Sequence, residues 1–294
     1  MRWRRSPGDS SGIEDRRRSG GGGMIPGGKI GGGIGGAGIV GVIVALLVVF
    51  LGGGGGGGFE IGPSLDPFQP AAPAAQDVVE GGPDPEADLR DFVAFVVSDV
   101  QNSWDEQFRT AGRQYDTTTL VLFRGNVSTA GCGAASSAAG PFYCPADRRV
   151  YLDLGFFREL QQRFGAPGDF AQAYVIAHEF GHHVQNLLGI MGQVDAERRR
   201  NPGAANDLSV RLELQADCLA GVWAHSAYQD DLLEEGDLEE GLNAAASVGD
   251  DRIQSQAGGR IDPESFTHGT AEQRREWFQR GFDGGEVAAC DTFS

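Results

Sequence analysis

The run AQAYVIAHEFGHHVQNLL, residues 171–188, contains the pattern His178-Glu179-x-x-His182 within an apolar stretch. Two imidazoles four residues apart on a helix lie one turn above each other on the same face, so both can reach one ion. A carboxylate directly after the first histidine lies beside that pair and can accept a proton from a water on the ion. This pattern is the usual sequence form of a zinc hydrolase helix. The stretch therefore predicts that His178 and His182 bind Zn²⁺ and that Glu179 is the general base.

The residues around the motif favour a helix. Asp169, with Gln172 three residues later, has the spacing of a capping box. Gly181 lowers helix propensity by about 1 kcal/mol relative to alanine, which makes sense if another backbone or a substrate packs closely there. The alternative is a buried helix whose histidines only bond to neighbours, but Glu179 would then be buried without an evident partner. We expect His183 to lie at the surface or behind the ligands, and we assign it no role.

The first third of the chain does not have a globular composition. Residues 1–29 carry seven basic side chains against three acidic ones, and residues 30–51 form an apolar stretch of 22 residues. That stretch is long enough to cross a bilayer once, and the basic residues before it favour a cytoplasmic N-terminus. A cleaved signal peptide is the competing interpretation, but Ala72-Pro73-Ala74 lies too far downstream to be its cleavage site. We therefore expect an uncleaved single-pass anchor in the cell membrane and an extracytoplasmic domain.

Four segments follow from this pattern. They are a basic cytoplasmic tail (1–29), a transmembrane anchor (30–51), a Gly/Pro/Ala-rich linker (52–87) and a folded domain (88–294). The net charge of the chain is −17, and so acidic a protein is a poor binder of nucleic acid. The expected partners are therefore the membrane and a peptide or protein substrate, with no nucleic acid.

The sequence of the folded domain predicts an α+β fold, mainly helical with a small sheet. Apolar residues at steps of three and four predict a helix from about Asp88 to Phe108. Two short β-rich runs, 117–123 and 149–154, predict strands. Beyond the motif helix we expect a polar connection at 197–207, then helices from Asp207 to Tyr228, from Asp237 with Glu240 as capping partner, and from Thr270 with Gln273.

All four cysteines, Cys132, Cys144, Cys218 and Cys290, follow the apolar stretch. An even number of cysteines in a domain that faces outward favours disulfides. Proximity in sequence favours Cys132 with Cys144, and Cys218 with Cys290, although four cysteines allow three pairings. A structural zinc site is the weaker alternative, because the chain contains no C-x-x-C pattern.

A catalytic zinc site needs a third protein ligand. The downstream candidates are Glu213, Asp217, His225 and His268, and RLELQADCLAG places Glu213 and Asp217 four residues apart on one face of a predicted helix. If Glu213 faces the ion, Asp217 lies one turn further and can accept the N–H of a ligand histidine, which fixes its tautomer. A solvated acidic face is the alternative, but the neighbouring residues are apolar. We favour Glu213 as the ligand over His225.

Three stretches resemble one known family in combination: HEFGHH, ELQADCLAGVWAH and FTHGTAEQRREWF. GPFYCPADRRVYLDLGFF, the closing CDTF and the N-terminal MRWRR…IEDRR fit the same family, the putative neutral zinc metallopeptidases, which are small membrane-anchored bacterial proteins. More distantly, HExxH with a later Glu-x-x-x-Asp resembles the gluzincin group of zinc peptidases. The resemblance implies a zincin-like fold, zinc bound by His178, His182 and Glu213, Glu179 as general base, and Asp217 behind the ligands.

His268 and Arg274 resemble a His…Arg pair that lies near the substrate in some membrane-associated gluzincins and stabilises the oxyanion. The departure is Gly269, where those relatives tend to have proline. The alternative is that His268 only caps the turn before the last helix. Asp250-Asp251 also resemble part of the family pattern, but helix capping explains them and we assign them no function.

The predicted function is a membrane-anchored zinc metallopeptidase. An extended peptide would add to the edge of the strand around Val150 to Asp153. The alternative from another class is a non-catalytic, membrane-tethered zinc domain that binds a partner or acts as a scaffold. A third interpretation, a zinc hydrolase acting on a non-peptide amide, stays open at this point. Retention of Glu179 favours an enzyme.

Overall fold

The computed structural model describes residues 1–4, 12–18 and 84–294. The strands are β1 (Ile13–Asp15), β2 (Thr119–Phe123), β3 (Asn126–Ser128), β4 (Ala134–Ser136), β5 (Phe142–Cys144) and β6 (Arg149–Asp153). The α-helices are α2 (Ala87–Thr110), α3 (Gly155–Gln162), α4 (Asp169–Leu187), α5 (Ile190–Arg200), α6 (Ala205–Gln229), α7 (Asp237–Ser247), α8 (Asp250–Gln256) and α9 (Ala271–Gly284). Short 3₁₀ turns η1 to η4 lie at Ser137–Ala139, Pro202–Ala204, Pro263–Ser265 and Val287–Cys290. The predicted α+β class, mainly helical with a small sheet, is confirmed.

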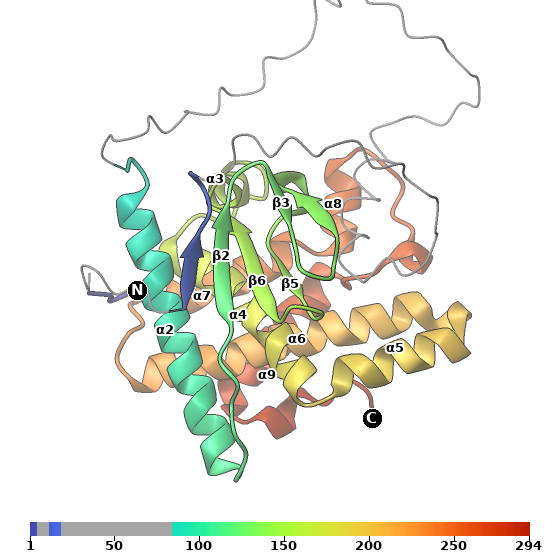
Figure 1. Ribbon diagram of the computed structural model, residues 1–294. Helices are drawn as coiled ribbons and strands as arrows, with labels where there is room; N and C mark the ends of the chain where they lie inside the picture. The colour runs from blue at the N-terminus through green and yellow to red at the C-terminus, as the bar shows by residue number, and fades with distance from the viewer. Residues whose placement is uncertain (5–11, 19–83) are drawn as a thin grey trace, which may run out of the picture.

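The main sheet has the strand order β1-β2-β6-β5 (Figure 1). β2 pairs in parallel with both β1 and β6, whereas β5 runs antiparallel to β6. β3 and β4 form a separate antiparallel pair. β6 is therefore an inner strand, and β5 pairs with it along Arg149–Tyr151, so the prediction that a peptide adds to the edge around Val150 to Asp153 is wrong at Val150 and Tyr151. Within the described part of the chain, β5 is the edge strand at that end of the sheet.

The helix with the motif lies in the centre of the molecule. α4 packs against α2, α6 and α7, and touches the sheet at β5 and β6. Gly181 lies where α4 meets α6: a Cβ there would stand 2.9 Å from the carbonyl oxygen of Ala216. The glycine thus allows the close approach of a second backbone, one of the two reasons expected from the sequence. His183 is fully buried, which excludes the surface, one of the two places predicted for it.

Most predicted helices and strands are confirmed, including α2, β2, β6, α6 and the complete capping box of Thr270 and Gln273 on α9. The capping box at Asp169 is wrong, because α4 begins at Asp169 itself and Gly168 precedes it without a side-chain cap. Glu240 does not cap its own helix either. Its carboxylate accepts the backbone N–H of Phe170, in the first turn of α4. The region predicted as a polar connection at 197–207 contains the end of α5 and the start of α6.

Residues 12–18 belong to the predicted cytoplasmic tail, 1–29, yet in the structure they contact the domain. β1 pairs with β2, and Ile13 packs against the core. Arg17 is 2% exposed and its guanidinium contacts Asp15 at 2.6 Å, Asp84 at 2.7 Å and Glu86 at 2.9 Å. Such a buried cation needs these partners, and two of them belong to the start of the domain.

The predicted anchor, residues 30–51, and most of the predicted linker, residues 52–87, lie outside the described residues. Among the residues that are described, none of the helices has the length and apolar content needed to cross a membrane.

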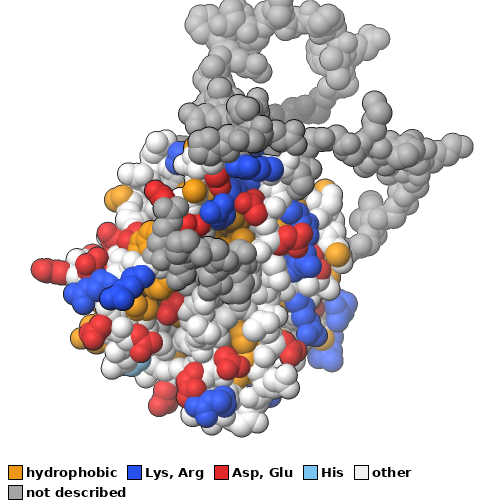
Figure 2. Space-filling view, turned by 60° about the vertical axis from the view of Figure 1, so that its left-hand side comes forward, with side chains coloured by type: hydrophobic (Ala, Val, Ile, Leu, Met, Phe, Trp, Pro, Cys, Tyr) orange, Lys and Arg blue, Asp and Glu red, His pale blue; other side chains and the backbone are white. Residues whose placement is uncertain are grey.

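The pairing of the cysteines is confirmed, with disulfides Cys132–Cys144 and Cys218–Cys290. On the face shown in Figure 2, basic and acidic side chains alternate among the described residues.

Candidate metal centre

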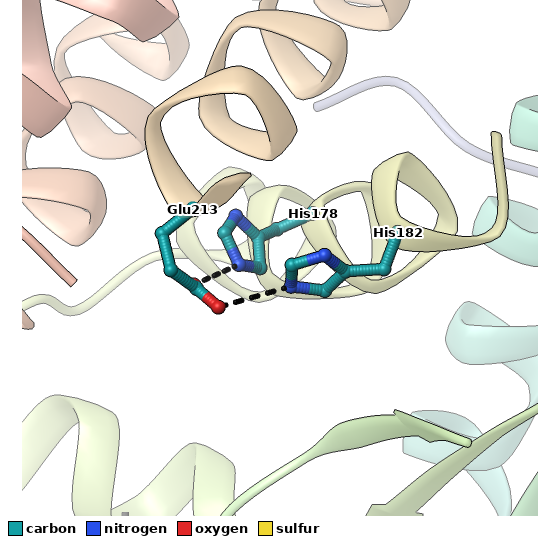
Figure 3. A group of neighbouring side chains, drawn as sticks. All are labelled: His178, His182 and Glu213. Atoms are coloured by element: carbon teal, nitrogen blue, oxygen red, sulfur yellow. Dashed lines mark hydrogen bonds and ion pairs between the residues drawn. The ribbon is translucent and has the colours of Figure 1, made fainter. Parts of the chain in front are cut away.

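The two motif histidines and Glu213 of α6 point toward one another (Figure 3). His178 Nε2 lies 3.2 Å from Glu213 Oε2, and His182 Nε2 lies 3.5 Å from Glu213 Oε1. All three side chains are buried. The spacing of four residues on α4 and the close contact of α4 with α6 at Gly181 bring these three residues together.

This arrangement fits a zinc ion. Ligand atoms at about 2.0–2.1 Å from a tetrahedral zinc stand roughly 3.3 Å from one another. The nitrogen–oxygen separations of 3.2 Å and 3.5 Å match that spacing. Two imidazoles and one carboxylate are also the donor set of a catalytic zinc site, in which the fourth position takes water or substrate.

Each ligand histidine is held through its other ring nitrogen. His178 Nδ1 lies 2.8 Å from Asp217 Oδ1, as the spacing of Glu213 and Asp217 predicts. His182 Nδ1 lies 2.9 Å from Oε1 of Gln185, whose amide N–H groups are directed at the carbonyl of Leu212. Both acceptors favour the tautomer with hydrogen on Nδ1, which leaves each Nε2 lone pair free for a metal.

Asp217 is fully buried and joins several groups. Arg274 donates to both of its oxygens, from Nε at 2.8 Å and from Nη2 at 3.0 Å. The hydroxyl of Tyr174 donates to Asp217 as well. Burial raises the pKa of Asp217, but the charge of Arg274 and the contacts of His178 outweigh it and hold the pKa below its ordinary value. Asp217 is thus an anion that fixes His178 in place.

The charges at the centre suit cation binding. Burial raises the pKa of Glu213, but the charge of His182 and the hydrogen bond of His178 hold it well below its ordinary value. Burial lowers the pKa of His178, but the charge of Asp217 and the bonds to Asp217 and Glu213 raise it to about 10. A metal binds the neutral imidazole, so metal binding at His178 competes with its protonation.

Glu179 lies in the same cavity as the three donors and is not one of them. Its side chain is buried, and burial raises the pKa of this carboxyl above its ordinary value. A carboxylate with a raised pKa is a better proton acceptor, which is the property required of a general base near neutral pH.

His268 lines the cavity and is held by Asp250. Asp250 Oδ1 lies 3.1 Å from His268 Nδ1, and its Oδ2 accepts the backbone N–H groups of residues 267, 268 and 269. Burial lowers the pKa of His268, but the hydrogen bond to Asp250 and the charge of Glu213 raise it above the ordinary value. Gly269 has φ +88°, a backbone angle that proline cannot adopt. The conformation of this loop therefore explains why glycine stands where the gluzincin relatives tend to have proline.

The remaining predicted residues have other surroundings. Arg274 lines the cavity, but its N–H groups are directed at Asp217, at the Tyr174 hydroxyl and at the carbonyl of Val248. His225 lies away from the centre, with Nδ1 2.6 Å from the carbonyl of Phe282, so it does not compete with Glu213. His183 Nε2 contacts the carbonyl of Asp116.

Sequence reasoning missed three residues that support the centre: Tyr174, Gln185 and Asp250. Tyr174 is four residues before His178 on the same helix face, a spacing that could have assigned its hydroxyl to the same network. Gln185 is three residues after His182, which gives a similar signal. Asp250 is 18 residues before His268, so no helical spacing connects the two, and the resemblance of Asp250-Asp251 to the family pattern is the signal that could have found it.

A histidine pair, a downstream glutamate and a free glutamate in one cavity define the class of proteins with an HExxH zinc centre completed by a Glu-x-x-x-Asp helix. The chain belongs to the putative neutral zinc metallopeptidase family, whose model matches residues 1–293.

The chain is similar to uncharacterized proteins of bacteria. It is 54% identical to the uncharacterized protein YpfJ of Escherichia coli K12 over 203 residues, which are 69% of this chain and 70% of that protein. It is 47% identical to the uncharacterized protein Rv2575 of Mycobacterium tuberculosis over 220 residues, 71% of this chain and 73% of that one. No solved structure matches the chain.

Proposed function

We propose that this protein is a zinc-dependent peptidase that hydrolyses peptide bonds at the centre of His178, His182 and Glu213. The observation that carries the proposal is the place of Glu179, which shares the cavity with the three donors and is not needed to hold the ion. A scaffold that only binds zinc has no use for a buried carboxylate of raised pKa beside its ligands.

The chemistry that a bound zinc ion supplies is Lewis acidity, which lowers the pKa of water toward 7 and polarises a carbonyl oxygen. Glu179 accepts the proton of the attacking water and passes it to the leaving amine. His268, fixed by Asp250, offers its Nε2 side to the oxyanion that forms on the scissile carbonyl. Arg274 acts through Asp217 and Tyr174, which it contacts, and so keeps His178 in position.

The substrate backbone adds to β5 in this proposal. β5 is the edge of the main sheet among the described strands, and Phe142 and Tyr143 line the cavity that contains Glu179. Edge addition uses the unpaired N–H and C=O groups of such a strand. Tyr143 also ties β5 to α4, because its hydroxyl lies 3.0 Å from His183 Nδ1.

The test is peptide cleavage by the full-length protein and by the isosteric variant Glu179→Gln. Both proteins should contain one zinc, and only the first should cleave a peptide library. Glu239→Gln, at an exposed position of α7, is the matched control and should keep full activity. Cleavage retained in Glu179→Gln contradicts the mechanism. Zinc in all three proteins with cleavage in none favours the scaffold alternative, or a hydrolase of non-peptide amides.

Membrane attachment through residues 30–51 is a second proposal, supported by the composition of that stretch. A single crossing there would place residues 12–18 and the domain on opposite sides, whereas β1 pairs with β2. A single crossing at residues 30–51 and the pairing of β1 with β2 therefore exclude each other within one chain.

Labelling with a membrane-impermeant maleimide, on cells that carry either Arg2→Cys or Ser294→Cys, decides between them. Equal labelling of the two variants supports the paired strand. Labelling of only one variant supports the single crossing.

A further inference from the structure

The cavity above the metal centre is apolar outside the centre itself. It encloses about 180 Å³. The residues that line it away from the centre are Ala138, Ala139, Gly140, Pro141, Phe142, Tyr143, Pro145, Phe156, Phe164, Val175, Met191, Leu212, Val248 and Ile253, with two charged exceptions, Glu159 and Arg163. The sheet edge, α3, α4, α5, α6 and α8 all contribute. A surface of this kind selects ligands by the apolar area that they bury.

The walls of the cavity leave little for a charged side chain to bind. Phe156 and Phe164 of the α3 region are only partly buried, so their rings are available for contact. Arg163 lies over the ring of Phe164, with its guanidinium carbon 5.3 Å from the ring centroid. From the α8 side, Val248 and Ile253 add two more partly buried aliphatic side chains.

The centre itself disfavours an acidic side chain. Glu179 and Glu213 line the cavity, and Arg274 is already paired with Asp217. An acidic side chain of a substrate would approach Glu179, which is not a zinc ligand, and the further arginine of the lining, Arg163, already lies over the ring of Phe164. A basic side chain would lose its hydration to apolar walls, which is costly. A large apolar side chain gains about 10- to 150-fold in binding when it is fully buried.

We propose that the substrate of this site is a peptide with a bulky apolar residue, aromatic or branched aliphatic, beside the scissile bond. This inference rests on the proposed peptidase function and names its substrate class. Unfolded or extended segments of proteins expose such residues, because folded proteins bury them.

The test uses matched peptides that differ only at one residue beside the bond that is cut. With the full-length protein, kcat/KM for a peptide with Phe or Leu there should exceed that for Ala at least tenfold, and Asp should be poorest. Cleavage that is indifferent to this residue, or fastest with Asp, Lys or Gly, overturns the inference while leaving the peptidase function intact.

Two variants connect the preference to the cavity. Ile253→Lys should lower kcat/KM for the Phe peptide at least tenfold and raise the ratio of kcat/KM for the Asp peptide to that for the Phe peptide. Ile261→Lys is the matched control at an exposed position outside the cavity and should change neither value. Phe156→Ala should also reduce the preference, and its unfolding temperature shows whether the fold is kept. Unchanged preference in both folded cavity variants overturns the inference.

A binding measurement gives a result that does not depend on turnover. The zinc-loaded Glu179→Gln variant should bind the Phe peptide at least tenfold more tightly than the Asp peptide in a calorimeter. If no peptide is cleaved by the wild-type protein, the proposed function fails, and this measurement still decides whether the cavity selects apolar side chains. Equal affinities overturn the inference.

Discussion

The metal centre and the N-terminal strand β1 are both essential parts of the folded domain, yet only the first was predictable. In the metal centre, His178 and His182 lie one turn apart on α4, and Glu213 and Asp217 one turn apart on α6. In the N-terminal region, Ile13 pairs with Leu120 across more than a hundred residues. Local spacing determines the first arrangement, whereas only the tertiary fold determines the second.

Loss of the third ligand should have the largest effect. Glu213→Ala removes the only donor that α6 gives to the centre, so zinc affinity should fall by more than about 100-fold, beyond the range for outer partners. Zinc content after dialysis measures this. Asp207→Ala, at an exposed position of the same helix, should retain the metal. Full zinc occupancy in Glu213→Ala would reject Glu213 as a ligand.

Loss of Arg17 tests the N-terminal region. Arg17→Ala removes the buried cation that joins Asp15, Asp84 and Glu86. Because Asp84 keeps Arg90 and Glu86 keeps Arg124, the loss should cost about 1–3 kcal/mol of unfolding free energy. Arg113→Ala, at an exposed position after α2, should cost less than about 0.5 kcal/mol. Chemical denaturation monitored by fluorescence compares them. Equal stability would show that residues 12–18 do not dock on the domain.

Loss of Gln185 tests how the centre is supported. Gln185→Ala frees His182 Nδ1 from its acceptor, so zinc affinity should fall about 10- to 100-fold without loss of the ligand itself. Competition with a zinc chelator gives the affinity. An unchanged affinity would mean that the orientation of His182 depends on zinc alone.

The smallest effect is expected from the second disulfide. Gln185 also contacts Gln215, which donates to the carbonyl of Cys290 at 2.9 Å, so the Cys218–Cys290 bridge lies at the end of a chain that starts at His182. The double variant Cys218→Ala/Cys290→Ala should weaken zinc binding by a few-fold, on the order of 1 kcal/mol or less. Cys132→Ala/Cys144→Ala is the matched control, and an equal effect in both would refute this coupling.

The parts of the site that were predicted share one physical property. Glu213 and Asp217 could be assigned because a helix repeats every 3.6 residues, so a ligand predicts its neighbour one turn away. Asp250 could not be assigned in this way, because its bonds to His268 depend on how α8 meets the loop before α9. β6 was expected at an edge because its own sequence says nothing about β5, which covers it.

Capping shows the same limit at shorter range. The box of Thr270 and Gln273 is local and was predicted in full. Asp169 and Glu240 also stand at helix starts, but tertiary contacts determine their partners. Asp169 contacts the amine of Met1 at 2.6 Å, and Glu240 accepts from Phe170 of another helix. A capping pattern in sequence therefore predicts a helix start better than it predicts the bond.

The most direct measurement is X-ray absorption at the zinc edge on the purified full-length protein and on Glu179→Gln. We expect the same first shell in both proteins, with two imidazole nitrogens and carboxylate or water oxygens at about 2.0–2.2 Å. That result is the one expected if His178, His182 and Glu213 hold the metal and Glu179 is free for catalysis. A sulfur ligand, a shell without imidazole, or a shell that changes in Glu179→Gln would contradict the central claim.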